Sequence, residues 1–113
     1  MISKATLLNI FKKCWSIKSS TKWEEENPSK GQCSVTALVI HDCFGGTILK
    51  TKVNDIWHFY NKVNDQVMDL TSGQFGMPIA YQDIESNMED ALTACSYEQY
   101  EYLKKQFAMH YYS

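Results

Sequence analysis

The sequence has none of the features that mark a membrane-spanning or nucleic-acid-binding protein. No apolar run approaches the roughly 20 residues that a membrane helix requires. The 11 lysine and arginine residues are outnumbered by 13 acidic residues and form no basic run or stripe. Because nucleic acid is held mainly by such basic patches, we expect neither a nucleic-acid partner nor a membrane partner.

Paired cysteines are also missing. The four cysteines show no C-x-x-C spacing, which argues against a zinc site or a thioredoxin-type motif; they are Cys14, Cys33, Cys43 and Cys95. His41, Asp42 and Cys43 are neighbours in a predicted helix, where consecutive side chains point in different directions. We therefore expect no metal site and no cofactor, and we interpret Cys14 and Cys95 as apolar fillers.

An export signal is not evident in the first residues. The apolar stretch within residues 1–13 is short, is interrupted by Asn9 and is followed by lysines instead of a small-residue cleavage site. We expect a cytoplasmic protein, since thiols stay reduced in that compartment.

The sequence does contain enough apolar material for one domain. A chain of 113 residues that is 44% hydrophobic and 13% aromatic is not of disordered composition. Folding should bury roughly two-thirds of the surface that the unfolded chain exposes. We expect a single domain over residues 1–113 with one hydrophobic core.

The hydrophobic pattern predicts three helices. Residues 3–15 form an amphipathic helix capped by Ser3, and residues 33–44 form a helix that is apolar nearly all round and so belongs in the middle of the domain. The last helix begins at Ser96, where Ser96 and Gln99 match a capping box. We interpret its many tyrosines as packing or as a surface for a homo-oligomer.

Three strands follow the central helix, at residues 47–53, 56–63 and 66–70. Asn54-Asp55 and Asn64-Asp65 separate them and are favourable two-residue turns. The predicted fold is α+β: a central helix packed on a three-stranded antiparallel meander, with flanking N- and C-terminal helices. Residues 71–95 are expected to form an irregular surface loop or a lid.

The turn at Asn64-Asp65 sets the positions of a histidine and an aspartate. If Val63 faces Gln66, then Tyr60 faces Asp69, and His58 is a diagonal neighbour of Asp69 on the same face of the sheet. A slip of one residue would separate them, so the pairing depends on this turn. We expect a hydrogen bond between the His58 imidazole and the Asp69 carboxylate.

Cys33 opens the central helix, directly after Gly31 and Gln32. The positive end of a helix favours a thiolate, and the first amides of a helix have no internal acceptor. If this helix packs its start against the His58 face, Cys33 is a nucleophile, His58 its base and later the acid, and Asp69 the residue that orients His58. The free amides, Gly31 and Gln32 would then form the oxyanion site.

Two resemblances support this interpretation. The order Cys33, His58, Asp69 and the segments at 58–61 and 69–71 are similar to those of transglutaminase-like and papain-like enzymes, which implies a minimal core of that kind. A set of segments covering most of the chain resembles the YunG-type family of small bacterial proteins; the segments are Trp23 and residues 27–33, 35–39, 45–48, 58–61 and 69–75. The second resemblance implies a bacterial cytoplasmic protein and leaves the activity open.

Other roles compete with catalysis for each residue. Cys33 is also explained as a buried thiol, His58 as a half-buried sheet residue, and Asp69 as the cap of the turn at Thr71. Trp23 either plugs the core or lines a substrate cleft, and Gln74 and Phe75 either return over the site or anchor their loop. The sequence predicts a cysteine-dependent acyl-transfer enzyme (amidase, peptidase, deamidase or transglutaminase-like) that acts on a peptide, amide or small molecule. The alternative prediction is a non-catalytic binding or regulatory module.

Overall fold

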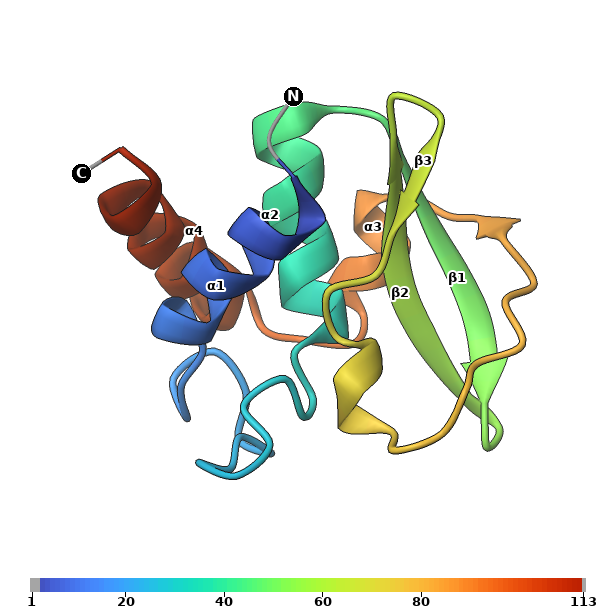
Figure 1. Ribbon diagram of the computed structural model, residues 1–113, viewed down its shortest axis with the longest axis horizontal. Helices are drawn as coiled ribbons and strands as arrows, with labels where there is room; N and C mark the ends of the chain where they lie inside the picture. Colours follow the sequence, from blue (N-terminus) through green and yellow to red (C-terminus); the bar gives the residue numbers. More distant parts are fainter. Residues whose placement is uncertain (1–2, 113) are drawn as a thin grey trace.

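The computed structural model describes residues 3–112 and has an α+β fold (Figure 1). The helices are α1 (Lys4–Cys14), α2 (Cys33–Phe44), α3 (Met88–Leu92) and α4 (Tyr97–Tyr111), with a 3-10 turn, η1 (Ser72–Gln74), after the third strand. The strands β1 (Thr47–Val53), β2 (Ile56–Val63), β3 (Gln66–Met68) and β4 (Ile84–Glu85) form an antiparallel sheet in the order β3-β2-β1-β4.

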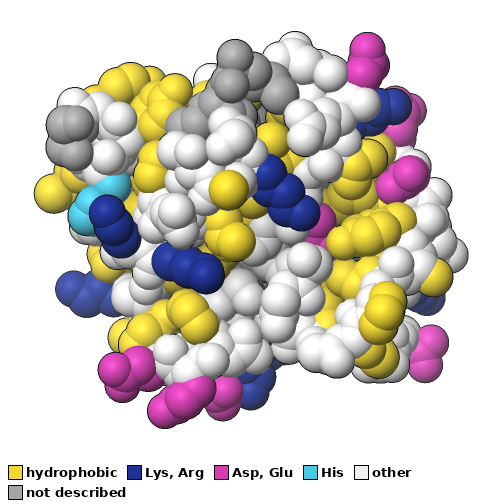
Figure 2. Space-filling view, in the orientation of Figure 1, with side chains coloured by type: hydrophobic (Ala, Val, Ile, Leu, Met, Phe, Trp, Pro, Cys, Tyr) yellow, Lys and Arg dark blue, Asp and Glu magenta, His cyan; other side chains and the backbone are white. Residues whose placement is uncertain are grey.

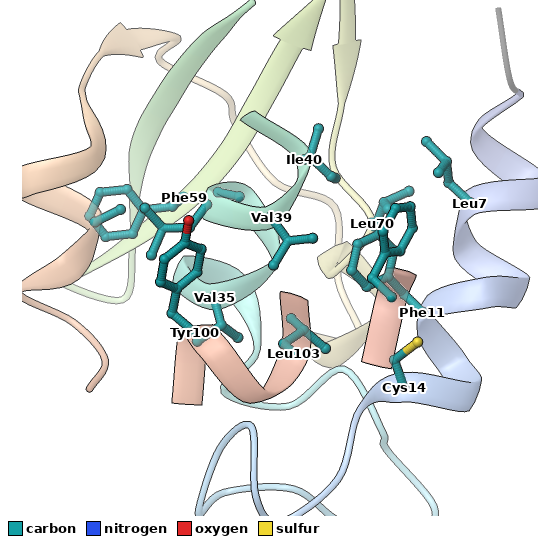
Figure 3. Close-up of a cluster of buried hydrophobic side chains, with 14 of the residues drawn as sticks. Leu7, Phe11, Cys14, Val35, Val39, Ile40, Phe59, Leu70, Tyr100 and Leu103 are labelled. Atoms are coloured by element: carbon teal, nitrogen blue, oxygen red, sulfur yellow. The ribbon is translucent and has the colours of Figure 1, made fainter. Parts of the chain in front are cut away.

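Helix α2 is the centre of the molecule. It lies between the sheet on one side and the pair α1 and α4 on the other (Figure 1). Every residue from Ser34 to Ile40 is buried, which confirms the expectation from its all-round apolar sequence. Figure 3 shows Val35, Val39 and Ile40 of this helix among core side chains from α1 and α4.

The two terminal helices begin where the sequence predicts. The Ser3 hydroxyl accepts a hydrogen bond from the Thr6 amide, and Ser96 and Gln99 form both halves of a capping box. The rings of Phe11 and Phe107 stack with their centroids 4.8 Å apart, which joins α1 to α4. Among the tyrosines of α4, Tyr100 is buried and packs in the core, whereas Tyr97 is 61% exposed; the homo-oligomer surface stays a prediction.

The predicted hairpin turns are confirmed. Asn54, Asp55, Asn64 and Asp65 all have positive φ angles, between 51° and 64°, as two-residue turns of the tightest kind require. Val63 pairs with Gln66, so the register on which the His58–Asp69 argument depends is the observed one.

The predicted sheet and its following loop need correction. The sheet has four strands instead of three, because β4 pairs with the outer edge of β1, and α3 also lies within the segment expected to be irregular. Strand β4 is only two exposed residues long and α3 only five residues, too short for a hydrophobic period to reveal them. Strand β3 ends at Met68, two residues before the predicted end.

Charged side chains are interspersed with apolar ones on the face in Figure 2, with no single basic stripe across it. Within residues 3–112, no helix is long and apolar enough to cross a membrane. The four cysteines are all free thiols.

The two glycines that end α2 offer a test of the backbone geometry. Gly45 and Gly46 both have positive φ, but a Cβ at Gly46 would lie 2.2 Å from the Lys62 carbonyl oxygen, whereas one at Gly45 would meet nothing within 4 Å. We expect Gly46→Ala to lower the free energy of unfolding by about 1 to 2 kcal/mol more than Gly45→Ala does. Urea denaturation of the two variants measures the difference, and equal stabilities would contradict the close approach of β2.

Candidate active site

A buried ion pair between His58 and Asp69 lies at the bottom of the site. His58 Nε2 lies 2.7 Å from Asp69 Oδ2, and the two side chains are 1% and 3% exposed. The other carboxylate oxygen, Oδ1, accepts hydrogen bonds from the Thr71 amide (3.1 Å) and the Thr71 hydroxyl (3.3 Å). Asp69 therefore both orients the imidazole and caps the turn that leads into η1.

Tyr81 completes the carboxylate's set of donors, and the sequence argument missed it. Its hydroxyl donates to Asp69 Oδ2 at 2.7 Å, on the same oxygen that His58 contacts. The ring packs edge-on against Tyr60, with centroids 4.9 Å apart. Tyr81 lies in a segment without hydrophobic periodicity, so no pattern in the sequence indicated where its side chain points.

The segment around Tyr81 is attached to the sheet and does not stand away from it. The Lys52 amide donates to Gln82 Oε1 (2.9 Å), and the Gln82 amide donates to Thr51 Oγ1 (3.0 Å). The Asp83 amide donates to the Tyr60 hydroxyl at 2.8 Å. These bonds hold the segment against the sheet, on the side where Tyr81 contacts the buried ion pair.

The environment favours the charged form of both partners. Burial works to lower the pKa of His58, but the hydrogen bond to the Asp69 carboxylate and the interaction with Cys33 raise it to about 9. Burial works to raise the pKa of Asp69, whereas its bonds to His58, Tyr81 and the Thr71 amide hold that pKa below its usual value. His58 is therefore an imidazolium at neutral pH, paired with a carboxylate.

Cys33 reaches His58 by a route that the sequence argument did not anticipate. Helix α2 packs against the opposite face of the sheet, where Asn61 Nδ2 donates to the Ala37 carbonyl oxygen at 3.0 Å. Pairing of β3 with β2 stops at Met68, so His58 has a strand neighbour on the β1 side, where it pairs with Thr51, but no β3 residue paired to it on the other side. The half-buried Cys33, at the start of α2, interacts there with the imidazole and raises the pKa of His58.

The two ring nitrogens of His58 have separate surroundings. Nε2 is engaged by Asp69, whereas Nδ1 is buried and has no partner within hydrogen-bonding geometry among the described residues. Cys33 is the side chain outside the ion pair that alters the charge of this ring. Nδ1 is thus the nitrogen left to exchange a proton with a thiol or a substrate.

Gly31 and Gln32 are packed more tightly than an open oxyanion site would suggest. Gly31 has φ +74°, and a Cβ there would lie 2.4 Å from Ser20 Oγ. The Gln32 side chain is fully buried, and its Nε2 donates to the Ser16 carbonyl oxygen at 3.4 Å. The first amides of α2, at Cys33 and Ser34, are the donors without an intrahelical acceptor beside the thiol.

The remaining predicted residues take different positions. Gln74 Oε1 accepts from the Gly31 amide at 3.0 Å, and its Nε2 donates to the Thr71 carbonyl oxygen at 3.0 Å, so this side chain ties the loop after β3 to the start of α2. Phe75 packs edge-on against His58 with centroids 4.9 Å apart. Trp23 packs partly buried against the core and is not among the residues that line the cleft.

A cleft of about 430 Å³ gives access to the thiol and the imidazole. It is walled by the loop before α2, the turn between β1 and β2, the η1 segment and the linker before α4. Cys33, His58, Gln74 and Phe75 all line it, whereas Asp69 lies behind His58. The structure thus brings Cys33, His58 and Asp69 together, with the half-buried Cys33 and the edge of the buried His58 along the cleft.

The remaining cysteines differ from Cys33 in their surroundings. Burial raises the pKa of the Cys14 thiol to about 11, and it also raises the pKa of Cys95, which lines the same cleft as Cys33.

The segment at residues 41–43 does not form a metal site. Asp42 instead contacts the Tyr100 hydroxyl and Lys104. In the part of the chain that the structure describes, no three His, Cys, Asp or Glu side chains gather as a metal site would require.

Comparison with known proteins gives a consistent result over nearly the whole chain. A family model described as YunG protein matches residues 3–112. A protein of Bacillus subtilis (strain 168), "Uncharacterized protein YunG", is 55% identical over 101 residues, which span 89% of this chain and 88% of the relative. No solved structure matches the chain significantly.

Proposed function

The chain belongs to the YunG family, and from that premise we propose that its cleft is the active site of a cysteine-dependent acyl-transfer enzyme. The observation that supports this most strongly is that the two ring nitrogens of His58 have different surroundings. Asp69 holds Nε2 at 2.7 Å and Nδ1 has no hydrogen-bond partner among the described residues, while the half-buried Cys33 interacts with the same ring. A core resembling that of transglutaminase-like and papain-like enzymes is part of the same proposal.

In the first half-reaction the Cys33 sulfur, as thiolate, attacks the carbonyl carbon of the substrate and forms a carbon–sulfur bond. The carbonyl electron pair moves to oxygen, where the amides of Cys33 and Ser34 at the start of α2 donate hydrogen bonds to it. The intermediate collapses as the imidazolium of His58 donates the Nδ1 proton to the leaving amine. The products are a thioester on Cys33 and a neutral His58.

In the second half-reaction the neutral His58 takes a proton from water or from an acceptor amine. The acceptor attacks the thioester carbon, the carbon–sulfur bond breaks, and the Cys33 thiolate leaves beside a regenerated imidazolium. Asp69 stabilises that imidazolium in both directions without taking its proton. Water as acceptor gives an amidase, peptidase or deamidase, and an amine gives a transglutaminase-like transfer.

The mechanism needs a free thiol, and hence a reducing compartment. All four cysteines are free in the structure, which accords with the cytoplasmic location that we propose. Tyr81 supports the mechanism from behind, because its hydrogen bond to Asp69 keeps the carboxylate in the orientation that His58 requires.

An activated acyl ester tests the proposal directly. We expect p-nitrophenyl acetate to acetylate Cys33 about a hundredfold faster than the exposed Cys43, because only Cys33 has an imidazole and helix amides beside it. Peptide mapping by mass spectrometry locates the acetyl group, and its later loss from Cys33 reports the second half-reaction. Mild iodoacetamide should select the same thiol, and the preference should disappear in His58→Ala.

Equal, slow modification of all four cysteines would overturn the enzyme proposal and leave the cleft as a binding or regulatory site. A Cys43→Ser variant serves as the matched control, since it removes an exposed thiol that does not line the cleft. Its acetylation pattern at Cys33 should be that of the unmodified protein.

A further inference from the structure

The charged side chains that line the cleft are all of one sign. Lys22 and Lys30 line it, and no aspartate or glutamate does, although the whole chain carries a net charge of −2. Apart from His58, the other polar side chains of the lining are hydroxyls, amides, thiols and the Trp57 indole. Although the net charge of the protein is negative, none of the described carboxylates lies on the walls of this cleft.

The two lysines differ in what they contact. Lys30 Nζ forms an ion pair with Glu24 Oε2 at 3.0 Å, whereas Lys22 has no ion pair within the described residues. The stem of Lys22 lies against Gly31, where an added Cβ would approach Lys22 Cβ to 2.8 Å. Lys22 therefore places an ammonium group without a carboxylate partner in the described part of the chain on one wall of the cleft. This wall includes Gly31, which lies two residues before Cys33.

Another wall is apolar and exposed. Val53, Ile56 and Trp57 line the cleft at the turn between β1 and β2, and Ile56 is 66% exposed. Lys50 Nζ and Lys52 Nζ lie 4.3 Å and 5.1 Å from the centroid of the Trp57 ring. Lys50 is neutralised by an ion pair with Asp90 at 2.7 Å, so Lys52 is the one that adds positive charge on this side. In Figure 1 this turn and the loop before α2 lie at the same end of the molecule as the start of α2.

We propose, on the basis of the acyl transfer at Cys33, that the cleft selects acyl donors that join an apolar chain to an anionic group such as a carboxylate. The apolar chain packs on Ile56 and Trp57, and the anionic group lies near Lys22. Since the lining holds no carboxylate, none competes with such a donor for Lys22. Lys22 is a specificity residue and takes no part in the bond changes.

Two esters with six-carbon acyl groups separate charge from size: the mono-p-nitrophenyl ester of adipic acid and p-nitrophenyl hexanoate. We expect Lys22→Gln to lower the rate constant for acylation of Cys33 by the adipate ester about three- to tenfold, with little effect on hexanoate. Lys22→Glu should lower it further. Raising the salt concentration should weaken the preference in the unmodified protein, because the contact is exposed to solvent.

Lys105→Glu on α4 is the matched control, since it changes the net charge as Lys22→Glu does but lies outside the cleft. An unchanged ratio of the two rate constants in Lys22→Glu, or a loss of preference in Lys105→Glu, would overturn the anion selection while leaving acyl transfer intact. Failure of both esters to acylate Cys33 would overturn the acyl-transfer proposal and this inference together.

Discussion

Replacing Asp69 by asparagine should slow the acylation of Cys33 about a hundredfold while leaving the fold in place. The substitution keeps the shape of the side chain and one oxygen. That oxygen takes over the position of Oδ1, where it accepts from the Thr71 amide and hydroxyl. The turn into η1 is therefore preserved, and the loss falls on His58.

The loss follows from the proton that each group carries. In the unmodified protein Nε2 bonds to Asp69 Oδ2, and Nδ1 has no hydrogen-bond partner among the described residues, which leaves it as the nitrogen for the proposed proton exchange with Cys33. In the variant an amide N–H replaces Oδ2, so Nε2 must accept and the single proton of a neutral imidazole moves to Nδ1. The pKa of His58 falls at the same time, because burial then acts without an opposing carboxylate. A neutral ring protonated at Nδ1 cannot take a proton from the thiol.

The acetylation rate of Cys33 measures the loss of acylation. The ¹⁵N chemical shifts of the His58 ring show which nitrogen carries the proton. Tyr81→Phe is the matched control, since it removes one hydrogen bond to the same oxygen but keeps the carboxylate and its charge. We expect Tyr81→Phe to change the rate only a few-fold. Equal rates for Asp69→Asn and the unmodified protein would mean that the pair serves stability alone.

The features of the fold that sequence could predict are those with local causes. The turns at Asn54-Asp55 and Asn64-Asp65 fix positive φ angles within two residues, and the register of both hairpins follows from them. The bounds of α2 follow from an apolar run between Gly31 and Gly45. Strand β4 has no such signal, because its two residues become a strand only through the free edge of β1.

The same distinction between local and distant causes explains which residues of the site could be predicted. His58 and Asp69 were placed by counting from one turn, and their 2.7 Å contact confirms the count. The approach of Cys33 required knowledge of where α2 crosses the sheet and where β3 ends, and both are set by packing over long sequence separations. Tyr81 was missed because it reaches Asp69 from a segment whose path depends on bonds to Thr51 and Lys52.

The stability of the protein should fall as the pH rises from about 6.5 to about 9. His58 has a pKa of about 9 in the folded state against its ordinary 6.5, so the folded state holds a proton that the unfolded state has released across this window. The stabilisation from His58 is therefore complete below pH 6.5 and is lost as the pH rises through 9. One proton over this range corresponds to about 3 kcal/mol in the free energy of unfolding.

The ionisation of Asp69 makes the stability of the protein depend on pH in the acidic range as well. Its pKa is lowered in the folded state, so its contribution is present above its ordinary value of 3.8 and is lost as the pH falls through the folded value. Urea denaturation from pH 5 to pH 9.5 should show the alkaline decrease in the unmodified protein and a smaller decrease in Cys33→Ser, which keeps the carboxylate but loses the contribution of the thiol. Asp69→Asn should lose it, because its His58 is already neutral. A persistent slope in Asp69→Asn would assign the decrease to other groups and remove the ion pair from the proposed mechanism.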